Sequence, residues 1–251
     1  MKALSLILIG MLLAFLTTAY GADLKKGTSA FERGNYASAF AEFFPLAESG
    51  DASAQYNLGV MYAEGKGVKQ NYELAFAWYT DAATQGIAQA QTNVGTMYLN
   101  GNGVVPNYAQ AAKWFHMAAA QGNAEAQFKL GAMYGSGHGV KEDDAQAVAW
   151  FRKSAVQGAA IAQFYLGVAY NYGQGVPQDF GQAATWYSKA AVQGLATAQY
   201  NLGVLYANGR GVKQDNDQAA IWYGKAAAQG DLQAQDDLRR LRTGSQGIPL
   251  H

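Results

Sequence analysis

The chain has 251 residues, with 18 basic and 18 acidic side chains and no cysteine. This even charge balance excludes the basic surface that binding of nucleic acid requires. A chain of this length also buries a core large enough to fold without disulfides.

Residues 1–21 have the pattern of a secretory signal peptide. Lys2 supplies the positive start, Leu4–Leu16 is a mostly apolar run, and Ala19-Tyr20-Gly21 places small residues at −3 and −1 of a cleavage site after Gly21. The apolar run is shorter than the roughly 20 residues that a membrane span needs. We therefore expect cleavage, no membrane insertion afterwards, and a periplasmic or secreted protein without a lipid anchor.

The dipeptide Gln-Gly recurs every 36 residues from Gln85-Gly86 to Gln229-Gly230. Self-similarity at such a period is typical of repeat architectures. It predicts five repeats at 51–86, 87–122, 123–158, 159–194 and 195–230. The five tryptophans of the chain fall at one position of the repeat: Trp78, Trp114, Trp150, Trp186 and Trp222.

The first half of each repeat predicts a helix. In the first repeat, Ala54, Leu58, Met61 and Tyr62 have the spacing of one apolar helix face. A glycine such as Gly59 lies inside this helix in every repeat, which predicts close approach by the backbone of a neighbouring helix. A Gly-x-Gly pair then ends the helix, because glycine adopts positive φ without strain.

The second half of each repeat predicts another helix. Its start is marked by an N-cap residue in all five repeats: Asn71, Asn107, Asp143, Asp179 and Asp215. A glutamine follows three residues later in four of them, which predicts a capping-box variant. This helix is expected to bury an alanine face together with the tryptophan and the aromatic residue after it, and to stop at the Gln-Gly dipeptide.

A helix pair of this size buries its apolar face only by stacking on the next pair. The expected fold is therefore all-α, a right-handed α/α superhelical solenoid of repeated helix pairs. Residues 22–50 are expected to form an N-terminal capping helix pair. Residues 231–251 are expected to form a C-terminal capping helix and tail, with Arg239 and Arg242 on what would be the next stacking surface.

The repeated unit contains Ala-Gln-x-x-Leu-Gly-x-x-Tyr, Gly-x-Gly-Val, Ala-x-x-Trp-aromatic and Gln-Gly. It resembles the Sel1-like repeat (SLR), a relative of the tetratricopeptide repeat with a longer loop inside the repeat. The resemblance implies an adaptor or scaffold; exported bacterial members include periplasmic regulators, cell-surface assembly factors and proteins that contact host cells. A cysteine-rich branch of the family has been linked to β-lactam binding, and this chain departs from that branch because it has no cysteine.

The sequence shows no pattern that carries chemistry. The histidines His116, His138 and His251 are not paired at a metal-ligand spacing, and the Gly-x-Gly loops lack the order of a phosphate-binding loop. Acidic clusters at 142–144 and 215–217 surround helix starts, where negative charge is favourable. We therefore expect no catalytic residue, no metal site and no cofactor.

The variable positions of the first helices suggest a binding surface. In the first repeat these positions are 53, 57, 60 and 64, and the equivalent positions in the fourth repeat, 161, 165, 168 and 172, hold only apolar or aromatic residues. Asparagine amides can bind a peptide backbone and tyrosines can anchor side chains. The candidate partner-binding residues are Asn57, Asn93, Lys129, Ile161, Tyr165, Val168, Tyr172 and Asn201.

The function predicted from the sequence is an exported, monomeric adaptor that holds a partner protein or peptide in the concave groove of the solenoid. Ordinary surface with residual packing between repeats is the alternative explanation of the variable positions. Two other functions stay open: a cell-envelope enzyme, such as a β-lactam or cell-wall hydrolase, and a polysaccharide-binding assembly factor.

Overall fold

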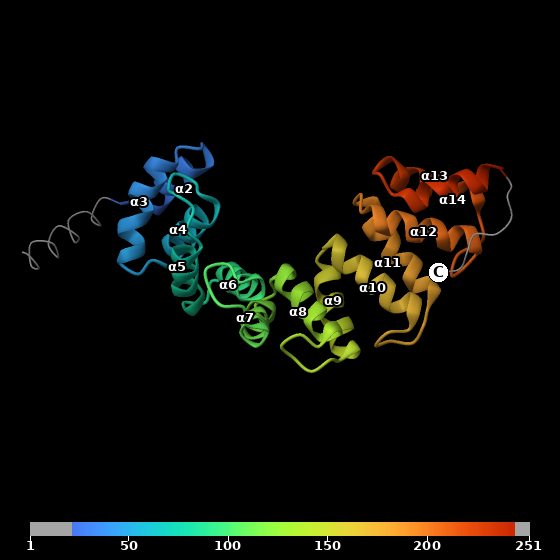
Figure 1. Cartoon of the computed structure of the whole chain (residues 1–251), viewed down its shortest axis with the longest axis horizontal. Coiled ribbons are helices and arrows are strands. Elements are labelled where there is room, and N and C mark those ends of the chain that lie inside the picture. The colour runs from blue at the N-terminus through green and yellow to red at the C-terminus, as the bar shows by residue number, and fades with distance from the viewer. Residues whose placement is uncertain (1–21, 244–251) are drawn as a thin grey trace, which may run out of the picture. The chain divides into compact units, whose positions relative to one another are not determined.

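A computed structural model describes residues 22–243 of the chain. These residues form thirteen α-helices, and none of them lies in a strand. The helices are α2 (Leu24–Glu32), α3 (Tyr36–Glu48), α4 (Ala52–Glu64), α5 (Tyr72–Thr84), α6 (Ala88–Asn100), α7 (Tyr108–Ala120), α8 (Ala124–Ser136), α9 (Asp144–Val156), α10 (Ala160–Tyr172), α11 (Phe180–Val192), α12 (Ala196–Asn208), α13 (Asn216–Ala228) and α14 (Leu232–Thr243). The predicted all-α repeat fold is confirmed (Figure 1), while the predicted signal segment 1–21 and the tail from residue 244 lie outside the described residues.

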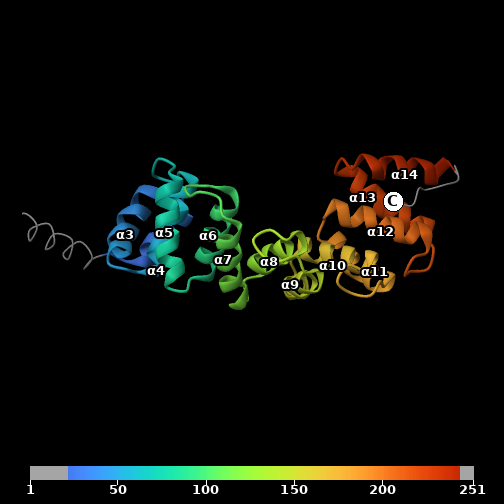
Figure 2. The same ribbon diagram turned by 60° about the horizontal axis from the view of Figure 1, so that its bottom comes forward.

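The chain divides into two compact units, Met1–Gln121 and Gly122–His251. In the first unit α2 to α7 pack consecutively, and in the second unit α8 to α14 do the same. Figures 1 and 2 show the helices of a pair side by side, for example α4 with α5 in the first unit and α10 with α11 in the second. The 36-residue period predicted an uninterrupted array, and the division falls between the second and third repeats.

The glycine inside each first helix lies against an aromatic ring of the second helix. A Cβ added at Gly167 in α10 would lie 2.6 Å from the ring of Tyr187 in α11, which only glycine avoids. The same arrangement holds for Gly59 with Tyr79, Gly95 with Phe115, Gly131 with Phe151 and Gly203 with Tyr223. The prediction of a close backbone approach was therefore wrong, because the group that fills the space over the glycine is an aromatic side chain.

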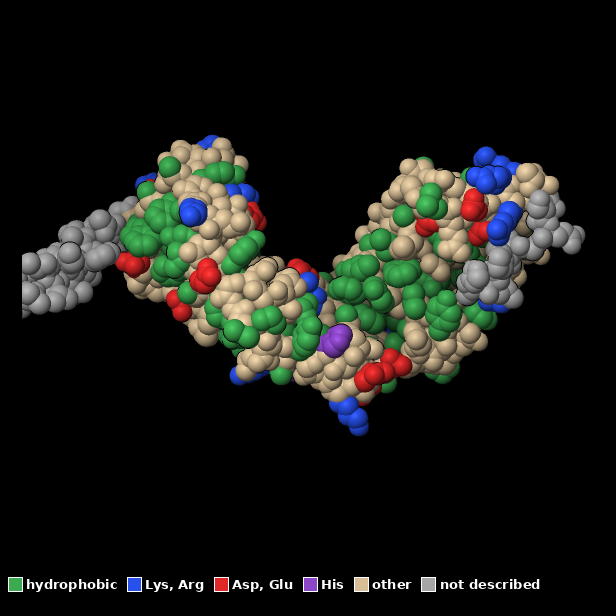
Figure 3. Space-filling model, in the orientation of Figure 1, with side chains coloured by type: hydrophobic (Ala, Val, Ile, Leu, Met, Phe, Trp, Pro, Cys, Tyr) green, Lys and Arg blue, Asp and Glu red, His purple; other side chains and the backbone are tan. Residues whose placement is uncertain are grey.

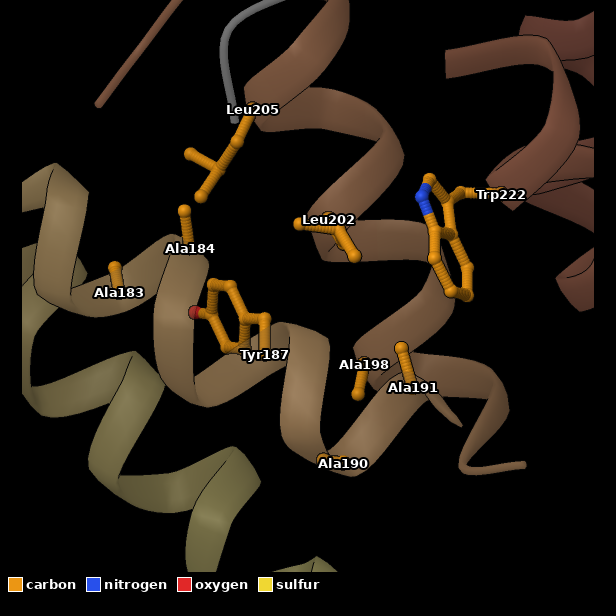
Figure 4. Close-up of a cluster of buried hydrophobic side chains, with 9 residues drawn as sticks. All are labelled: Ala183, Ala184, Tyr187, Ala190, Ala191, Ala198, Leu202, Leu205 and Trp222. Atoms are coloured by element: carbon orange, nitrogen blue, oxygen red, sulfur yellow. The ribbon is translucent and has the colours of Figure 1, made fainter. Parts of the chain in front are cut away.

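The tryptophan position is less buried than predicted, and the aromatic residue after it is the deeper one. Trp150, Trp186 and Trp222 are buried, whereas Trp78 and Trp114 are half-buried. The next residue along the chain is buried in all five repeats. Figure 4 shows one such core in the second unit, where Tyr187 of α11 and Leu202 of α12 lie on facing sides of the interface and Trp222 lies on the other side of α12.

The second helices begin at the predicted N-caps. The five Asn or Asp side chains each accept the backbone N–H of the residue three positions later. The backbone N–H of each cap donates to a tyrosine carbonyl of the first helix, as Asp179 does to Tyr170 over 2.9 Å. Since that N–H is already bonded, the glutamine three residues later does not close a capping box, and this part of the prediction was wrong.

The Gly-x-Gly loops connect one repeat to the one before it. The first glycine ends the first helix with a left-handed φ, such as 71° at Gly173. The second glycine, Gly175 at φ 67°, lies against the backbone of Asp144 at the start of the preceding second helix, where a Cβ would collide. Both positions therefore require glycine, the first for its conformation and the second for the close approach as well.

Glutamines form a ladder of hydrogen bonds between repeats. The side-chain amide of Gln193 donates to the Gly158 carbonyl over 2.9 Å and to the Gln163 side-chain oxygen over 2.8 Å. Gln163 in turn donates to the Ala155 carbonyl over 3.1 Å. Equivalent glutamine pairs are Gln85 with Gln55, Gln121 with Gln91, Gln157 with Gln127 and Gln229 with Gln199. Because carbonyls at a helix C-terminus lack partners within the helix, the ladder satisfies them with side chains from the next repeat.

The last helix, α14, is held by a buried carboxylate. Asp237 is 3% exposed; its Oδ2 accepts the hydroxyl of Tyr200 at 3.1 Å, and its Oδ1 lies 3.6 Å from Arg240 Nη1. Arg239 and Arg242 of the same helix are exposed. Among residues 22–243, no helix is both long enough and apolar enough to cross a membrane.

Candidate functional site

The predicted partner-binding residues lie on the first helices of all five repeats. Asn57 and Asn93 belong to the first unit, and the other six belong to the second. In α10, Ile161 and Tyr165 are each 40% exposed and Tyr172 is 56% exposed, while Val168 between them is half-buried. The second unit thus carries an apolar strip along α10, which we call the α10 strip: Ile161, Tyr165, Val168 and Tyr172. Figure 3 shows hydrophobic side chains gathered over α10 and its neighbours.

The side chains of the three asparagines interact with other groups of the protein. Asn57 donates to the Ser53 carbonyl over 2.9 Å, and Asn201 donates to the Thr197 carbonyl over 2.7 Å. The side chain of Asn93 interacts with the hydroxyl of Tyr79. An asparagine amide has two N–H groups and an oxygen, so each bond fixes the orientation of the amide while using only part of its capacity.

Lys129 of α8 is paired in the same way. Its ammonium lies 3.5 Å from the carboxylate of Glu125, one helical turn earlier, and the two side chains are partly exposed. Such a pair contributes only about 0.3–0.5 kcal/mol.

The ring of Tyr165 packs against three other aromatic rings. Its centroid lies 5.5 Å from that of Phe128, 5.4 Å from that of Phe151 and 5.4 Å from that of Phe164. The ring is therefore fixed by packing although two fifths of the side chain faces outward. A rigid, half-exposed tyrosine offers contact area at low entropic cost.

A cavity of about 350 Å³ lies beside Tyr165, between α8, α9 and α10. Its walls are mostly apolar and include Phe151, Val168 and Ala169, with Ser136, Asp144 and Gln174 as the polar groups. We call it the repeat-3 cavity. The repeat pattern did not predict it, because a cavity results from small residues and the pattern is marked by large ones.

The repeat-3 cavity exists because the third repeat has small or short residues where other repeats have larger ones. Position 132 is Ala, and the equivalent residues are Val60, Thr96, Val168 and Val204. Position 135 is Gly, and the equivalents are Ala63, Leu99, Asn171 and Ala207. Position 144 is Asp, and the equivalents are the larger Tyr72, Tyr108 and Phe180 in three repeats and Asn216, of the same size, in the fifth. Comparing these columns would have located the cavity from the sequence.

One serine and one histidine meet at the rim of the cavity. Ser136 Oγ lies 3.0 Å from His138 Nδ1, and the two residues are exposed and two positions apart. We interpret the contact as a hydrogen bond of the loop. Within residues 22–243, no three His, Asp or Glu side chains are placed to hold a metal ion.

The Sel1 repeat family model matches five segments of the chain, residues 52–87, 88–123, 124–158, 160–195 and 196–231. These segments agree with the predicted repeats to within one residue at their N-terminal ends. No curated protein matches the chain.

Solved structures give two similar proteins at substantial identity. A protective antigen of uropathogenic Escherichia coli with an SLR fold is 36% identical with a TM-score of 0.85; the match covers 94% of this chain and 53% of the antigen. A Sel1 repeat protein from Oxalobacter formigenes is 35% identical with a TM-score of 0.78, over 86% of this chain and 88% of that protein. The chain thus spans about half the length of the antigen.

A third structure shares only the fold. An immunity protein of Pseudomonas aeruginosa is 20% identical with a TM-score of 0.54, and the match covers 92% of this chain and 90% of that protein.

Proposed function

Because the chain belongs to the Sel1 repeat family, we propose that it is an exported, non-enzymatic adaptor that binds a partner protein or peptide on its first helices. The observation that carries the proposal is the α10 strip with Tyr165 at its centre. In this proposal Tyr165 and Tyr172 are the anchors, and Asn201 of the next repeat binds the backbone of the partner.

The α10 strip is unusual among the repeats, which supports a binding role. The residues equivalent to Tyr165 are Asn57, Asn93, Lys129 and Asn201. A polar residue at this position is therefore compatible with the fold, and packing alone does not require a tyrosine there. Half-exposed tyrosines on a rigid support are typical of binding hot spots.

Export is supported by the sequence of the first 21 residues. The positive start, the apolar run and the small residues at 19 and 21 form the pattern of a cleaved secretory signal. The partner is therefore proposed to be a protein of the periplasm or of the cell exterior.

The proposal is tested by cross-linking the native cell with a reagent that does not cross the inner membrane, followed by mass spectrometry of the captured partner. Affinity for that partner is then measured with Tyr165→Asn, which introduces the residue of three other repeats. We expect a loss of about 2 kcal/mol or more in binding free energy, the threshold of a hot spot.

The matched control is Val192→Ala on α11. Val192 is 70% exposed, and the equivalent residues Ala120 and Ala228 show that alanine is tolerated there. The control should bind with unchanged affinity. Equal affinities of the two variants, with equal helix content by circular dichroism, would mean that the α10 strip is only a packing surface.

A further inference from the structure

The repeat-3 cavity has mostly apolar walls and one carboxylate among its lining groups. Asp144, the first residue of α9, is the ionised side chain at its wall, and the remaining walls include Phe151, Val168 and the ring of Tyr165. Asp144 makes no ion pair within residues 22–243. The site is therefore a mostly apolar cavity with one exposed carboxylate in its wall.

The helix ends around the cavity add to this charge. Helix α8 ends at Ser136 and α10 ends at Tyr172, so two C-terminal ends with partial negative charge lie next to the cavity. The N-terminus of α9 has the opposite sign, but its cap Asp143 already accepts the Gln146 N–H at 2.9 Å. The balance of these groups favours a cation.

Two cationic side chains of α8 and α9 interact with groups outside the cavity. Arg152 of α9 donates to the hydroxyl of Tyr170 over 2.6 Å and lies over that ring. Lys129 of α8 is paired with Glu125. Neither side chain lines the cavity, and neither does Lys141 in the loop before α9. Asp144 is therefore the one charged side chain in the lining, and a positive group of a bound molecule would complement it.

We propose that the repeat-3 cavity binds an arginine side chain of the partner peptide. The aliphatic part of the arginine packs on Val168 and Phe151, the guanidinium stacks on Tyr165, and its N–H groups donate to the carboxylate of Asp144. This inference rests on the proposed function, since it names the chemistry that the adaptor recognises beside the α10 strip.

Two substitutions taken from other repeats test the cavity without endangering the fold. Asp144→Asn introduces the residue of the fifth repeat, Asn216, and removes only the charge. Gly135→Leu introduces the residue of the second repeat, Leu99, and fills the cavity; a Cβ at this position makes only an ordinary contact of 3.6 Å with Ala147. Asp217→Asn in the first turn of α13, away from the cavity, controls for loss of an acidic residue near a helix start.

The experiment titrates the ¹⁵N-labelled protein with three capped tripeptides, Ala-Arg-Ala, Ala-citrulline-Ala and Ala-norleucine-Ala, and follows the backbone amide shifts. We expect saturable shifts at Gly135, Asp144 and Val168, with the arginine peptide binding about fivefold more tightly than the two neutral ones, which corresponds to one charge-assisted bond at a partly exposed site. Asp144→Asn should abolish this preference, Gly135→Leu should abolish binding of all three peptides, and Asp217→Asn should change neither.

The outcomes separate this inference from the proposed function. Equal affinity for the arginine and norleucine peptides, or no saturable shift at the cavity, would overturn the arginine site. If the cross-linked partner loses affinity with Tyr165→Asn but not with Asp144→Asn, the adaptor function stands and the arginine site fails. If the partner loses affinity with Asp144→Asn but not with Tyr165→Asn, the arginine site stands and the proposed role of the α10 strip is wrong. If neither substitution alters binding of the partner, both proposals fail.

Discussion

At the scale of single residues, the buried aromatic of the second helix differs among repeats only by a hydroxyl. It is Tyr at 79, 187 and 223 and Phe at 115 and 151. The Tyr79 hydroxyl interacts with the Asn93 side chain, whereas the hydroxyls of Tyr187 and Tyr223 are buried without a hydrogen-bond partner in the described part of the chain. Burial raises the pKa of Tyr187 far above the ordinary tyrosine value, so this side chain is neutral at physiological pH.

The hydroxyl contrast leads to a prediction for matched substitutions. Tyr187→Phe removes an unpaired buried group, whose burial costs about 1–3 kcal/mol, so the free energy of unfolding should stay constant or rise. Tyr79→Phe removes the interaction with Asn93 and should lower that free energy by about 1 kcal/mol. Urea unfolding followed by circular dichroism measures both, and an equal loss of stability in the two variants would contradict the assignment.

At the scale of elements, the helix pair is held by a ring packed on a glycine. A glycine in a helix interior normally costs about 0.5–1 kcal/mol relative to alanine. The five first helices nevertheless all contain one, because the ring of the second helix occupies the position of the missing Cβ. The requirement for glycine at this position therefore comes from the neighbouring helix and not from the helix that contains the glycine.

Two glycines of the fifth repeat should respond to alanine with opposite signs. A Cβ at Gly203 in α12 would lie 2.7 Å from the Tyr223 ring, so Gly203→Ala should lower the free energy of unfolding by about 1–3 kcal/mol, as overpacked cores do. Gly224 in α13 has no atom within 4 Å of an added Cβ, so Gly224→Ala should raise it by about 0.5–1 kcal/mol. The melting temperatures of the two variants should lie on either side of the parent, and two shifts of the same sign would disprove the packing argument.

At the scale of the whole molecule, stability comes from contacts between consecutive helices. In the second unit the glutamine ladder and the buried clusters connect each repeat with its neighbours, and Trp186 of the fourth repeat packs on the cluster of Ala147, Phe151 and Leu166. Nearest-neighbour contacts of this kind make stability a local property of the array.

Trp186→Ala tests how local the stability is. Truncation of a buried tryptophan should lower the free energy of unfolding by about 3–5 kcal/mol. Hydrogen exchange followed by mass spectrometry should then show faster exchange in α9 to α12, while the amides of α4 and α5 in the other unit keep their protection. Equal loss of protection in α4 and α5 would show that the chain unfolds as one cooperative body.

The proposed site was only partly predictable from the sequence. The exposure of Ile161, Tyr165 and Tyr172 was expected from their register with polar residues in other repeats, and the structure places them at the surface. The support of Tyr165 by Phe128, Phe151 and Phe164 was not expected, since it depends on rings from three helices. The role of these residues in binding stays a prediction.

The sequence by itself determined the period, the helices and their caps. These features depend on residues a few positions apart, as between Asp179 and the Gln182 N–H, and such local relations are repeated five times. Only the tertiary structure decided which aromatic is deepest, that Gln193 bonds the Gly158 carbonyl 35 residues earlier, that a cavity opens beside Asp144, and that the chain divides after Gln121. These outcomes depend on the volumes of side chains that meet from different helices, which the periodic pattern of a single chain does not contain.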